Sequence, residues 1–407
     1  MKTNDSWLAA PAADPAEWLL DPRVVFLNHG AFGACPRAVL AHQQALRERM
    51  ERQPLQFLAR DLEPLLDAAR GTLAEFVGAD PADLVFVPNA TAGVNSVLRG
   101  LELGPDAEIL VTNQEYNACR NAAQYAAARQ GARVVVAAIP FPLVHEDEIV
   151  QSILAAVTPR TRLAMLDHVV SQTGLILPIA RLARELAAHG VDLLVDGAHA
   201  PGMVPLDLTR LGAAYYTGNL HKWVCAPKGA AFLHVRRDRQ AQIRPLVIGH
   251  GANSARTDRS RFLIEFAWPG TWDPSACLSV PVALDFLATR LPGGWPAVMA
   301  RNHALALAAR AVLCTALGIA EPCPPANVGS TAAVPLPDAP PDGAPTPPVF
   351  EYPLQTHLRE SAGIEVPLMP WPAPPRRLLR VSAQLYNSLP QYEFLATQLC
   401  RALGEGR

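Results

Sequence analysis

Short apolar runs alternate with helical patterns between residues 83 and 235 of this chain. Seven runs are rich in Val, Ile, Leu, Phe and Tyr, as strands buried on both faces require, and they lie at 83–88, 108–113, 133–139, 162–170, 191–199, 213–218 and 229–235. Helical patterns lie between them, at 91–101, 117–132 and 178–190. Such alternation predicts an α/β fold in which helices cover both faces of a large, mostly parallel, seven-stranded sheet.

The pattern changes after Pro281. Two helical segments come first, and a proline-rich stretch at 321–348 follows, which we interpret as irregular with one strand at 330–336. The remaining signals are a helix at 353–363, strands at 364–369 and 377–384, and a last helix. We therefore expect two domains, a large domain of residues 22–282 and a smaller α+β domain of residues 1–21 and 283–407.

The composition excludes several classes of partner. The chain has 35 basic and 37 acidic residues and no long run of like charge, which argues against nucleic acid or an anionic membrane. No apolar run has the length of a membrane span, and the first twenty residues contain no signal-peptide core. The seven cysteines show no zinc-site spacing, so we expect reduced thiols, a cytoplasmic location and no metal site.

Polar residues follow two of the predicted strands at positions suited to a ligand. In open α/β sheets, ligands bind beyond the carboxyl ends of the strands. Asp196 ends one apolar run, where burial is costly unless a positive partner is present, and His199 follows three residues later. Another run leads through Ala90 and Thr91 into a helix, and a helix N-terminus is a natural anion site.

Three more polar side chains follow strands at the same edge, namely Tyr116, Ser171 and Lys222. Together with Asp196 they suit a planar cationic ring that carries a phosphate, which describes pyridoxal 5'-phosphate (PLP). Asp196 would pair with the ring nitrogen, Tyr116 would stack on the ring and Ser171 would face its hydroxyl. Lys222 would form a Schiff base, because its amine is nucleophilic toward the aldehyde.

The chain resembles the class V aminotransferase family of fold-type I PLP enzymes, and within it the isopenicillin N epimerase-like branch. The resemblance covers nearly the whole chain, and the stretches that carry it are FLNHGAFGACP (26–36), NATAGVNSVL (89–98), DGAHAPG (196–202), TGNLHKW with APKG (217–229), WPGTWDPSA (268–276) and LLRVSAQLYN (378–387). It implies that Lys222 holds the cofactor, that Asp196 pairs with the pyridine nitrogen and that His199 lies close to the ring.

The resemblance also implies which residues surround the phosphate and the substrate. The phosphate would be bound by Ala90, Thr91, Thr217 and His221. Thr271 would reach the phosphate of a neighbouring subunit, so that the active unit would be a homodimer with active sites at the subunit interface. Arg380 would clamp the substrate α-carboxylate with its bidentate fork, and Asn28 and His29 would line the substrate side. His29 can equally be a turn histidine.

One departure from the family pattern concerns the substrate side. Trp272 stands where relatives often carry a basic residue, so the substrate side of this chain departs from the family pattern. Arg256, Arg259 and Arg261 are interpreted as a solvated, mobile segment, or else as contacts for an acidic substrate tail.

The resemblance leaves three reactions open. After removal of the Cα proton, the products can be those of an epimerase, a C–S β-lyase or an aminotransferase. A cysteine desulfurase is less favoured, because the chain has no cysteine between 324 and 399, although Cys323 is a candidate. A nicotinamide-dependent oxidoreductase is disfavoured, because no strand is followed by G-x-G-x-x-G.

Overall fold

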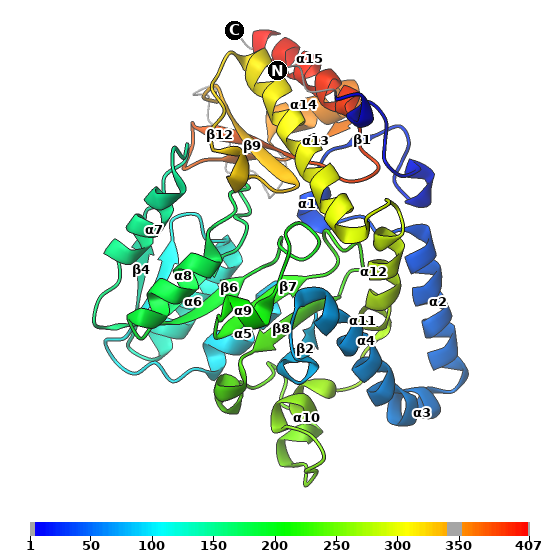
Figure 1. Cartoon of the computed structure of the whole chain (residues 1–407), viewed down its shortest axis with the longest axis vertical. Coiled ribbons are helices and arrows are strands. Elements are labelled where there is room, and N and C mark those ends of the chain that lie inside the picture. Colours follow the sequence, from blue (N-terminus) through cyan, green and yellow to red (C-terminus); the bar gives the residue numbers. More distant parts are fainter. Residues whose placement is uncertain (1–4, 340–351, 406–407) are drawn as a thin grey trace.

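The computed structural model describes residues 5–339 and 352–405. A large sheet with its helices forms the lower part of the molecule in Figure 1, and a smaller group of strands and helices lies above it. The strands of the large sheet are β2 (Leu84–Val87), β3 (Glu108–Thr112), β4 (Arg133–Ala137), β5 (Thr161–Asp167), β6 (Asp192–Asp196), β7 (Tyr215–Asn219) and β8 (Ala231–Val235).

The seven strands lie in the order β2-β8-β7-β6-β5-β3-β4. Strand β8 runs antiparallel to both of its neighbours, and every other pair in the sheet is parallel. The mostly parallel, seven-stranded sheet predicted from the apolar runs is therefore confirmed.

Successive side chains of the central strands enter two different cores, because a strand points alternate residues to opposite faces. Leu110 and Leu166 belong to one buried cluster, whereas Ile109 and Met165 belong to another. Each fully buried side chain of this size contributes about 1.5–3 kcal/mol to folding. This double burial explains why the strands read as continuous apolar runs.

Helices cover both faces of the sheet and extend along one side of it (Figure 1). Those that follow its strands are α5 (Ala90–Gly100), α6 (Asn117–Arg129), α7 (Glu146–Ala155), α8 (Ile179–Ala188), α9 (Leu208–Leu211) and α10 (Arg261–Ala267). The others of this part are α1 (His29–Phe32), α2 (Arg37–Arg52), α3 (Pro54–Gln56), α4 (Leu62–Val77), α11 (Ser275–Leu278) and α12 (Val280–Ala288).

The smaller part contains a three-stranded antiparallel sheet in the order β11-β12-β9. Its elements are α13 (Gly294–Leu317), β9 (Thr331–Leu336), α14 (Pro353–Ala362), β11 (Leu368–Pro370), β12 (Arg377–Ser382) and α15 (Leu389–Glu405). Strand β1 (Val25–Phe26) pairs in parallel with β10 (Ile364–Glu365), which ties the segment before α1 to this part of the chain.

One predicted strand is wrong in detail. The run at 364–369 forms two strands that belong to different sheets, β10 and β11. Pro367 lies between them, and because proline has no N–H to donate, it interrupts a hydrogen-bonded ladder. The strand predicted at 330–336 is confirmed as β9, while residues 340–348 of the proline-rich stretch lie outside the described residues.

The N-terminal residues pack on the C-terminal part. The Ala12 N–H donates to the Leu385 carbonyl at 2.8 Å, and the rings of Trp18 and Tyr386 lie 5.1 Å apart between centroids. Such contacts agree with grouping residues 1–21 with 283–407, but the boundary at 282 falls inside α12. The division into two domains therefore stays a prediction.

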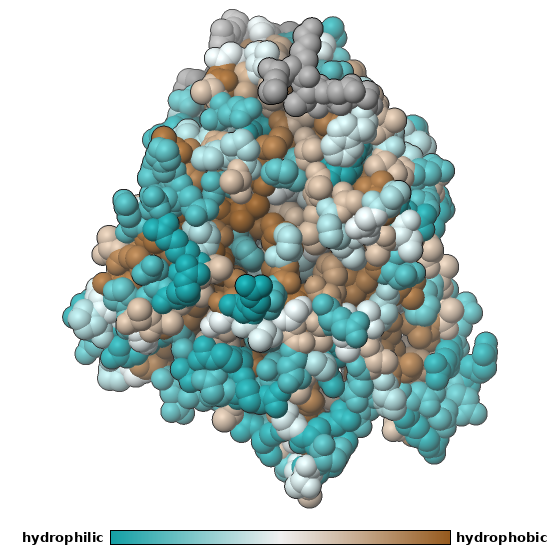
Figure 2. Space-filling view, viewed as in Figure 1, coloured by the Kyte–Doolittle hydropathy of each residue, from teal (hydrophilic) through white to brown (hydrophobic). Residues whose placement is uncertain are grey.

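Figure 2 shows hydrophilic side chains over the lower part of one face and hydrophobic ones gathered across its middle. Within the described ranges, no helix combines the length and apolar character that crossing a membrane requires.

Candidate active site

Lys222 lies in the loop between β7 and β8, at the carboxyl edge of the parallel strands. Its Nζ atom is 2.9 Å from Nε2 of His199. Burial, followed by the positive charge of Arg380, lowers the pKa of Lys222 to about 7, while the charges of Asp196 and Asp167 oppose this shift. A substantial fraction of the amine is therefore neutral near neutral pH, and this is the form that acts as a nucleophile or base.

His199 follows β6 and is buried behind Lys222. Its Nδ1 atom faces the indole Nε1–H of Trp223 at 3.4 Å. Because an indole N–H can only donate, Nδ1 must accept, and the ring proton of neutral His199 then lies on Nε2. Burial, followed by the charge of Lys222, holds the pKa of His199 well below its ordinary value. His199 is thus a neutral donor that orients the Lys222 amine.

Asp196 is the last residue of β6, and its side chain is only 2% exposed. One carboxylate oxygen accepts the Ala198 N–H at 2.9 Å, and the other accepts the thiol of Cys119 at 3.1 Å. Burial raises the pKa of Asp196, while these hydrogen bonds and the charge of Lys222 oppose the rise. The carboxylate is therefore fixed in direction and suited to a cation that is itself buried.

The N-terminus of α5 points to the same edge of the sheet. Asn89 caps the helix by accepting the Ala92 N–H at 2.8 Å. Thr91 is half-buried in its first turn, next to Ala90, whose N–H donates to the side chain of Asn219 at 2.9 Å. The helix start is thus present where the sequence predicted an anion site, although the Ala90 N–H is bonded within the protein.

Asn219 is a site residue that the sequence analysis missed. It ends β7, and its side chain reaches the start of α5. Thr217, which was predicted to bind the phosphate, lies two residues earlier, where its hydroxyl donates to the Phe232 carbonyl at 2.8 Å across the sheet. A strand boundary one residue later would have pointed to Asn219 as the polar residue that ends β7.

His221 immediately precedes Lys222 and is half-buried. Its Nδ1 atom lies 3.3 Å from the Ala230 carbonyl, to which it donates, so Nε2 faces the other way. Burial, together with the charge of Lys222, lowers the pKa of His221 to about 4. The imidazole is therefore a neutral group at the predicted phosphate side.

Arg380 brings the smaller part of the chain to the site. It lies on β12, is 4% exposed, and its Nη1 donates to the Ser171 carbonyl and lies 3.5 Å from the Ser171 hydroxyl. Burial lowers the pKa of Arg380 to about 10, so the guanidinium stays charged at neutral pH. Tyr116, at the start of α6, is 43% exposed and lies at the open side of the same cluster.

His29 lies behind the lysine loop. Its ring is buried, with Nδ1 2.7 Å from the Tyr386 hydroxyl and Nε2 3.0 Å from the Lys222 carbonyl. Both ring nitrogens are thus bonded within the protein, which agrees with the alternative reading of His29 as a structural histidine. Asn28 is also buried, and its amide nitrogen is 3.5 Å from the Glu365 carboxylate. The substrate-side roles of both residues stay predictions.

Thr271 lies on an exposed turn between α10 and α11. Among the described residues, no hydrogen bond or ion pair joins Thr271 to Lys222, so its predicted role depends on a second subunit. Trp272 is half-buried and packs against the apolar cluster of α4 and α11.

The three arginines that the sequence analysis interpreted as a solvated, mobile segment form ion pairs, and Arg256 and Arg261 are exposed to solvent. Arg256 pairs with Glu63 at 3.0 Å, Arg259 pairs with Asp67 at 3.1 Å, and Arg261 pairs with Glu265 at 2.6 Å. The first two pairs tie the segment before α10 to α4. These arginines are therefore held by carboxylates of the same chain.

Gly33 is the closest neighbour of the lysine loop on the side of α1, and its φ angle is +69°. A Cβ atom at Gly33 would lie 1.9 Å from the His221 carbonyl oxygen and 3.0 Å from the Lys222 Cα. The lysine loop therefore lies where a side chain at Gly33 would have to be.

We expect Gly33→Ala to destabilise the protein by about 3 kcal/mol or more and to impair cofactor binding, because the loop must move. Gly190→Ala is the control, since Gly190 has a φ of +71° with no atom within 4 Å of the added Cβ. The free energy of unfolding of that variant should decrease by only about 1 kcal/mol. Urea unfolding and cofactor titration would measure both, and equal effects would show that the clash is unimportant.

The donor set of this site fits PLP. The ligand needs an amine, an anionic partner for its ring nitrogen and donors for its phosphate. Lys222 supplies the amine, Asp196 the buried carboxylate, and the α5 N-terminus the donors. Neutral His221 gives its one ring proton to the Ala230 carbonyl, so its Nε2 atom would donate to a phosphate only in the protonated imidazolium form. In addition, the buried Nε of Arg380 has no hydrogen-bond partner among the described residues, which leaves capacity for a carboxylate.

Comparisons with known proteins agree with this reading. The profile described as Aminotransferase class-V matches residues 25–313. Isopenicillin N epimerase of Amycolatopsis lactamdurans is 39% identical over 392 residues, covering 93% of this chain and 95% of that protein. A probable chloroplastic L-cysteine desulfhydrase of Arabidopsis thaliana is 31% identical over 396 residues, covering 92% and 82%. A solved structure of the cystine C–S lyase C-DES with its product cysteine persulfide is similar, with a TM-score of 0.77 at 22% identity, covering 93% and 98%.

Proposed function

Since this chain belongs to the class V aminotransferase family of PLP-dependent enzymes, we propose that Lys222 holds this cofactor and that the enzyme acts at the Cα atom of an amino-acid substrate. The family and the fold-type I architecture predicted from the sequence are both confirmed. The observation that carries the proposal is the 2.9 Å contact between the amine of Lys222 and the neutral ring of His199.

The residues of the site divide the work of proton removal. PLP, when bound, supplies an electron sink for the negative charge that develops at the substrate Cα. Lys222, once free of the cofactor, is the base that takes the Cα proton, and its pKa of about 7 suits this task at neutral pH. His199 orients the amine, and Asp196 would stabilise a positive charge at the ring nitrogen of the bound cofactor.

Arg380 is the proposed clamp for the substrate carboxylate. Its guanidinium is buried and charged, and it lies near both Lys222 and Tyr116, as their mutual electrostatic effects on pKa indicate. A bidentate pair with a carboxylate fixes the orientation of Cα as well as its position. The substrate class that follows is an α-amino acid with a free carboxylate.

We expect Arg380→Ala to raise KM by about 100-fold, because two charged hydrogen bonds are lost. The kcat value should change much less, since the clamp binds ground state and transition state alike. Arg377→Ala is the matched control on the same strand, since Arg377 donates to the Pro337 carbonyl at 2.9 Å and faces away from the site. A KM that is unchanged in Arg380→Ala would contradict the assignment.

We favour epimerisation at Cα as the reaction. Its support is the likeness to isopenicillin N epimerase, which extends over 93% of this chain. The second candidate is β-elimination from a cysteine derivative, with C–S cleavage, which the similar L-cysteine desulfhydrase and cystine C–S lyase favour. Transamination is a third outcome of the same proton removal.

A cysteine desulfurase remains the least favoured reaction. Cys323 is buried, and its carbonyl and sulfur accept hydrogen bonds from Arg310 at 2.9 and 3.4 Å. Burial raises the pKa of the Cys323 thiol, whereas an attacking thiolate needs exposure and a lowered value. Cys225 is also buried, as a packing residue would be.

Incubation in D₂O with a panel of amino acids separates the three reactions. The panel contains L-amino acids, cysteine conjugates and isopenicillin N. Deuterium at Cα with a growing second epimer supports epimerisation, whereas release of pyruvate, ammonia and a thiol supports β-elimination. A keto acid that forms only with an amino acceptor supports transamination. If PLP is bound and no substrate exchanges its α-proton, proton removal at Cα is not the activity on this panel.

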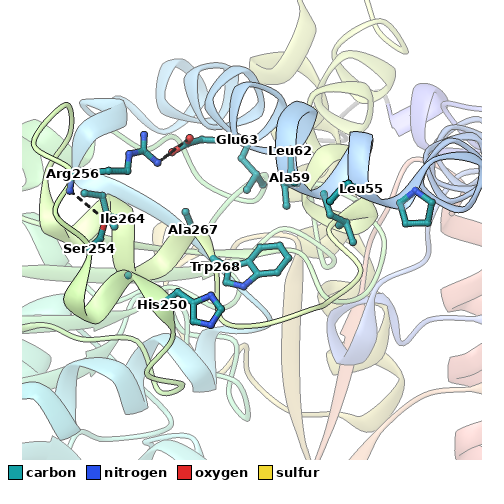
Figure 3. A pocket seen from close by; sticks show the side chains of 14 residues that line it. Leu55, Ala59, Leu62, Glu63, His250, Ser254, Arg256, Ile264, Ala267 and Trp268 are labelled. Atoms are coloured by element: carbon teal, nitrogen blue, oxygen red, sulfur yellow. Dashed lines mark hydrogen bonds and ion pairs between the residues drawn. The ribbon is translucent and has the colours of Figure 1, made fainter.

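The proposed active unit is a homodimer in which Thr271 reaches the cofactor of the other subunit. An apolar groove of about 630 Å³ lies between α4 and the segment that leads to the Thr271 turn. In Figure 3, Leu55 and Leu62 line one side of this groove and Trp268 lines the other. Leu246, Val247 and Ile248 are exposed by 41–62% in the preceding segment. A second copy would cover both apolar features.

Mixing Lys222→Ala and Thr271→Ala subunits tests this arrangement. If Thr271 crosses between subunits, each mixed dimer has one site without either defect. Random reassociation should then restore about a quarter of the wild-type activity, since half of the dimers are mixed and each has one intact site. Activity equal to the average of the two parents would place Thr271 in its own subunit, and a fully active monomer in light scattering would exclude the dimer.

A further inference from the structure

Two further carboxylates lie beside Asp196 and have no part in the proposed reaction. Asp167 ends β5 and is the direct neighbour of Asp196 in the parallel ladder. Glu115 follows β3, the next strand of the sheet. The side chains of Glu115 and Asp167 are each only 3% exposed, so three buried carboxyl groups share one edge of the sheet.

Glu115 is the unusual member of this group. Its carboxylate oxygens have no side-chain hydrogen-bond partner in the part of the chain that the structure describes, and the backbone N–H of Tyr116 is the one hydrogen-bonding group that lowers its pKa. One of these oxygens lies within 4.8 Å of both the Asp196 carboxylate and the Cys119 sulfur. One oxygen of Asp167 is likewise without a partner among the described residues. Charged carboxylates in such surroundings would carry a large desolvation cost, whereas neutral carboxylic acids would not.

The neighbouring charges act in the same direction. Burial raises the pKa of Glu115 well above its ordinary value, and the charges of Asp167 and Asp196 raise it further. Among the described residues, seven groups face this cluster, namely Asp167 on β5, Asp196 on β6, Tyr216 on β7, Tyr116 before α6, Cys119 and Arg120 on α6, and Lys222 in the loop after β7. The Tyr116 backbone N–H and, less strongly, Arg120 oppose the rise in the pKa of Glu115. Lys222 and the same N–H oppose the rise in the pKa of Asp167, but burial outweighs them in both cases.

We propose that Glu115 is held as a neutral carboxylic acid and acts as a positioning residue for Asp196, so that the three carboxyl groups present a single negative charge to a single buried cation. Cys119 donates to Asp196 at 3.1 Å, and the acid O–H of Glu115, whose oxygen lies within 4.8 Å of the same carboxylate, places a neutral dipole there in place of a second negative charge. Asp167 is protonated for the same reason. The part of this inference that concerns the cation rests on the proposed cofactor, whereas the neutrality of Glu115 does not.

The apo-protein gives the first test, because the folded state should bind more protons than the unfolded state. The ordinary pKa of a glutamate is 4.5, and that of Glu115 is raised. Between these two pH values, the free energy of unfolding should decrease as pH rises. The unfolding equilibrium constant should then increase by up to about tenfold per pH unit for each extra proton held. Glu115→Gln mimics the neutral acid but cannot release a proton. In this variant, the unfolding equilibrium constant should therefore depend less steeply on pH, by up to about tenfold per pH unit. Asp167→Asn should do the same.

Glu108→Gln is the matched control at the opposite end of β3. Burial alone would raise the pKa of Glu108, but hydrogen bonds from Thr158, Arg133 and Arg160 outweigh it and lower the pKa to about 2. Removing this charge should therefore decrease stability at neutral pH and leave the slope between pH 5 and 8 unchanged. Urea unfolding of the apo-proteins at several pH values measures all three variants. A Glu115→Gln slope equal to that of wild type would overturn the proposal.

The holoenzyme gives the second test, which separates positioning from mere packing. Glu115→Gln should retain turnover within a few-fold, because its amide N–H can replace the acid O–H. Glu115→Ala should lower turnover by about tenfold or more. It should also change how the absorption of the bound cofactor depends on pH. Equal losses in both variants would contradict the neutral state. Zinc binding by the apo-protein that disappears in Glu115→Gln would also overturn it, since a ligand carboxylate must be ionised.

A failure of this inference is distinguishable from a failure of the proposed function. If PLP does not attach to Lys222, the proposed function is wrong, but the pH dependence of apo-protein unfolding still reports on Glu115. If PLP attaches and the apo-protein slope does not respond to Glu115→Gln, the inference alone is wrong.

Discussion

Lys222→Ala is expected to abolish covalent attachment of PLP and to lower turnover by about 10⁴-fold, because one amine serves as both the attachment point and the Cα base. The chain contains only three lysines, at positions 2, 222 and 228. Borohydride reduction followed by peptide mapping therefore has few alternatives to separate. The label should lie on the peptide that contains Lys222 in wild type and should be absent from the variant.

Lys228→Ala is the control for this experiment. Lys228 lies in the same loop, but it is exposed and donates to the Gly33 carbonyl at 3.0 Å. Its loss should leave the label and most of the turnover in place. A label on Lys228 or on Lys2 in the wild-type protein would contradict the whole assignment of the site.

The pH profile gives a second reading of Lys222. Because the pKa of Lys222 is lowered to about 7, turnover should fall about tenfold per pH unit below that value, as the base becomes protonated. The charge of Arg380 is one cause of the lowered pKa. In Arg380→Ala, the pKa of Lys222 should therefore rise, and the acidic limb of the pH profile of turnover should move to higher pH. This shift tests the link between the two residues independently of KM.

The site could be located from the sequence because the carboxyl ends of parallel strands meet at one edge of a sheet. Asp196, Ser171 and Lys222 each follow a different apolar run, and the structure brings them to that edge. Their neighbourhood follows from local patterns and a general rule about α/β sheets. Arg380 could not be found in this way, because it lies in another part of the chain, and only the resemblance to a family indicated it.

Asn219 shows the limit of local patterns. It lies at the end of β7 on the same face as Thr217, which only the resemblance indicated, and both side chains lie against α5. The partners of Arg256 and Arg259 were missed for a different reason. They pair with Glu63 and Asp67, which are 193 and 192 residues away, and hydrophobic periodicity carries no information about such distant ion pairs.

The second large effect is expected for Asp196→Asn, which should lower turnover by about 10⁴-fold while PLP still binds. An amide cannot stabilise a positive ring nitrogen, and the analogous loss of an orienting aspartate in a serine protease costs a similar factor. The amide oxygen can still accept the Ala198 N–H, and the amide NH2 can donate to the Cys119 sulfur in place of the present thiol bond, so the side chain should keep its position. The loss should therefore fall on kcat, with little change in the amount of bound cofactor.

Apo-protein stability separates this chemical effect from misfolding. Burial raises the pKa of Asp196, so in the apo-protein its charge opposes folding as pH rises above the ordinary carboxyl range. Asp196→Asn should consequently leave the apo-protein at least as stable as wild type at pH 8, although the holoenzyme is almost inactive. Asp192 lies at the other end of β6 and forms an ion pair with Arg239 at 2.8 Å. Asp192→Asn removes this ion pair, so the apo-protein should become slightly less stable while turnover stays nearly complete. If Asp196→Asn keeps near-normal turnover, or if Asp192→Asn loses it, the partner of the ring nitrogen has been assigned to the wrong carboxylate.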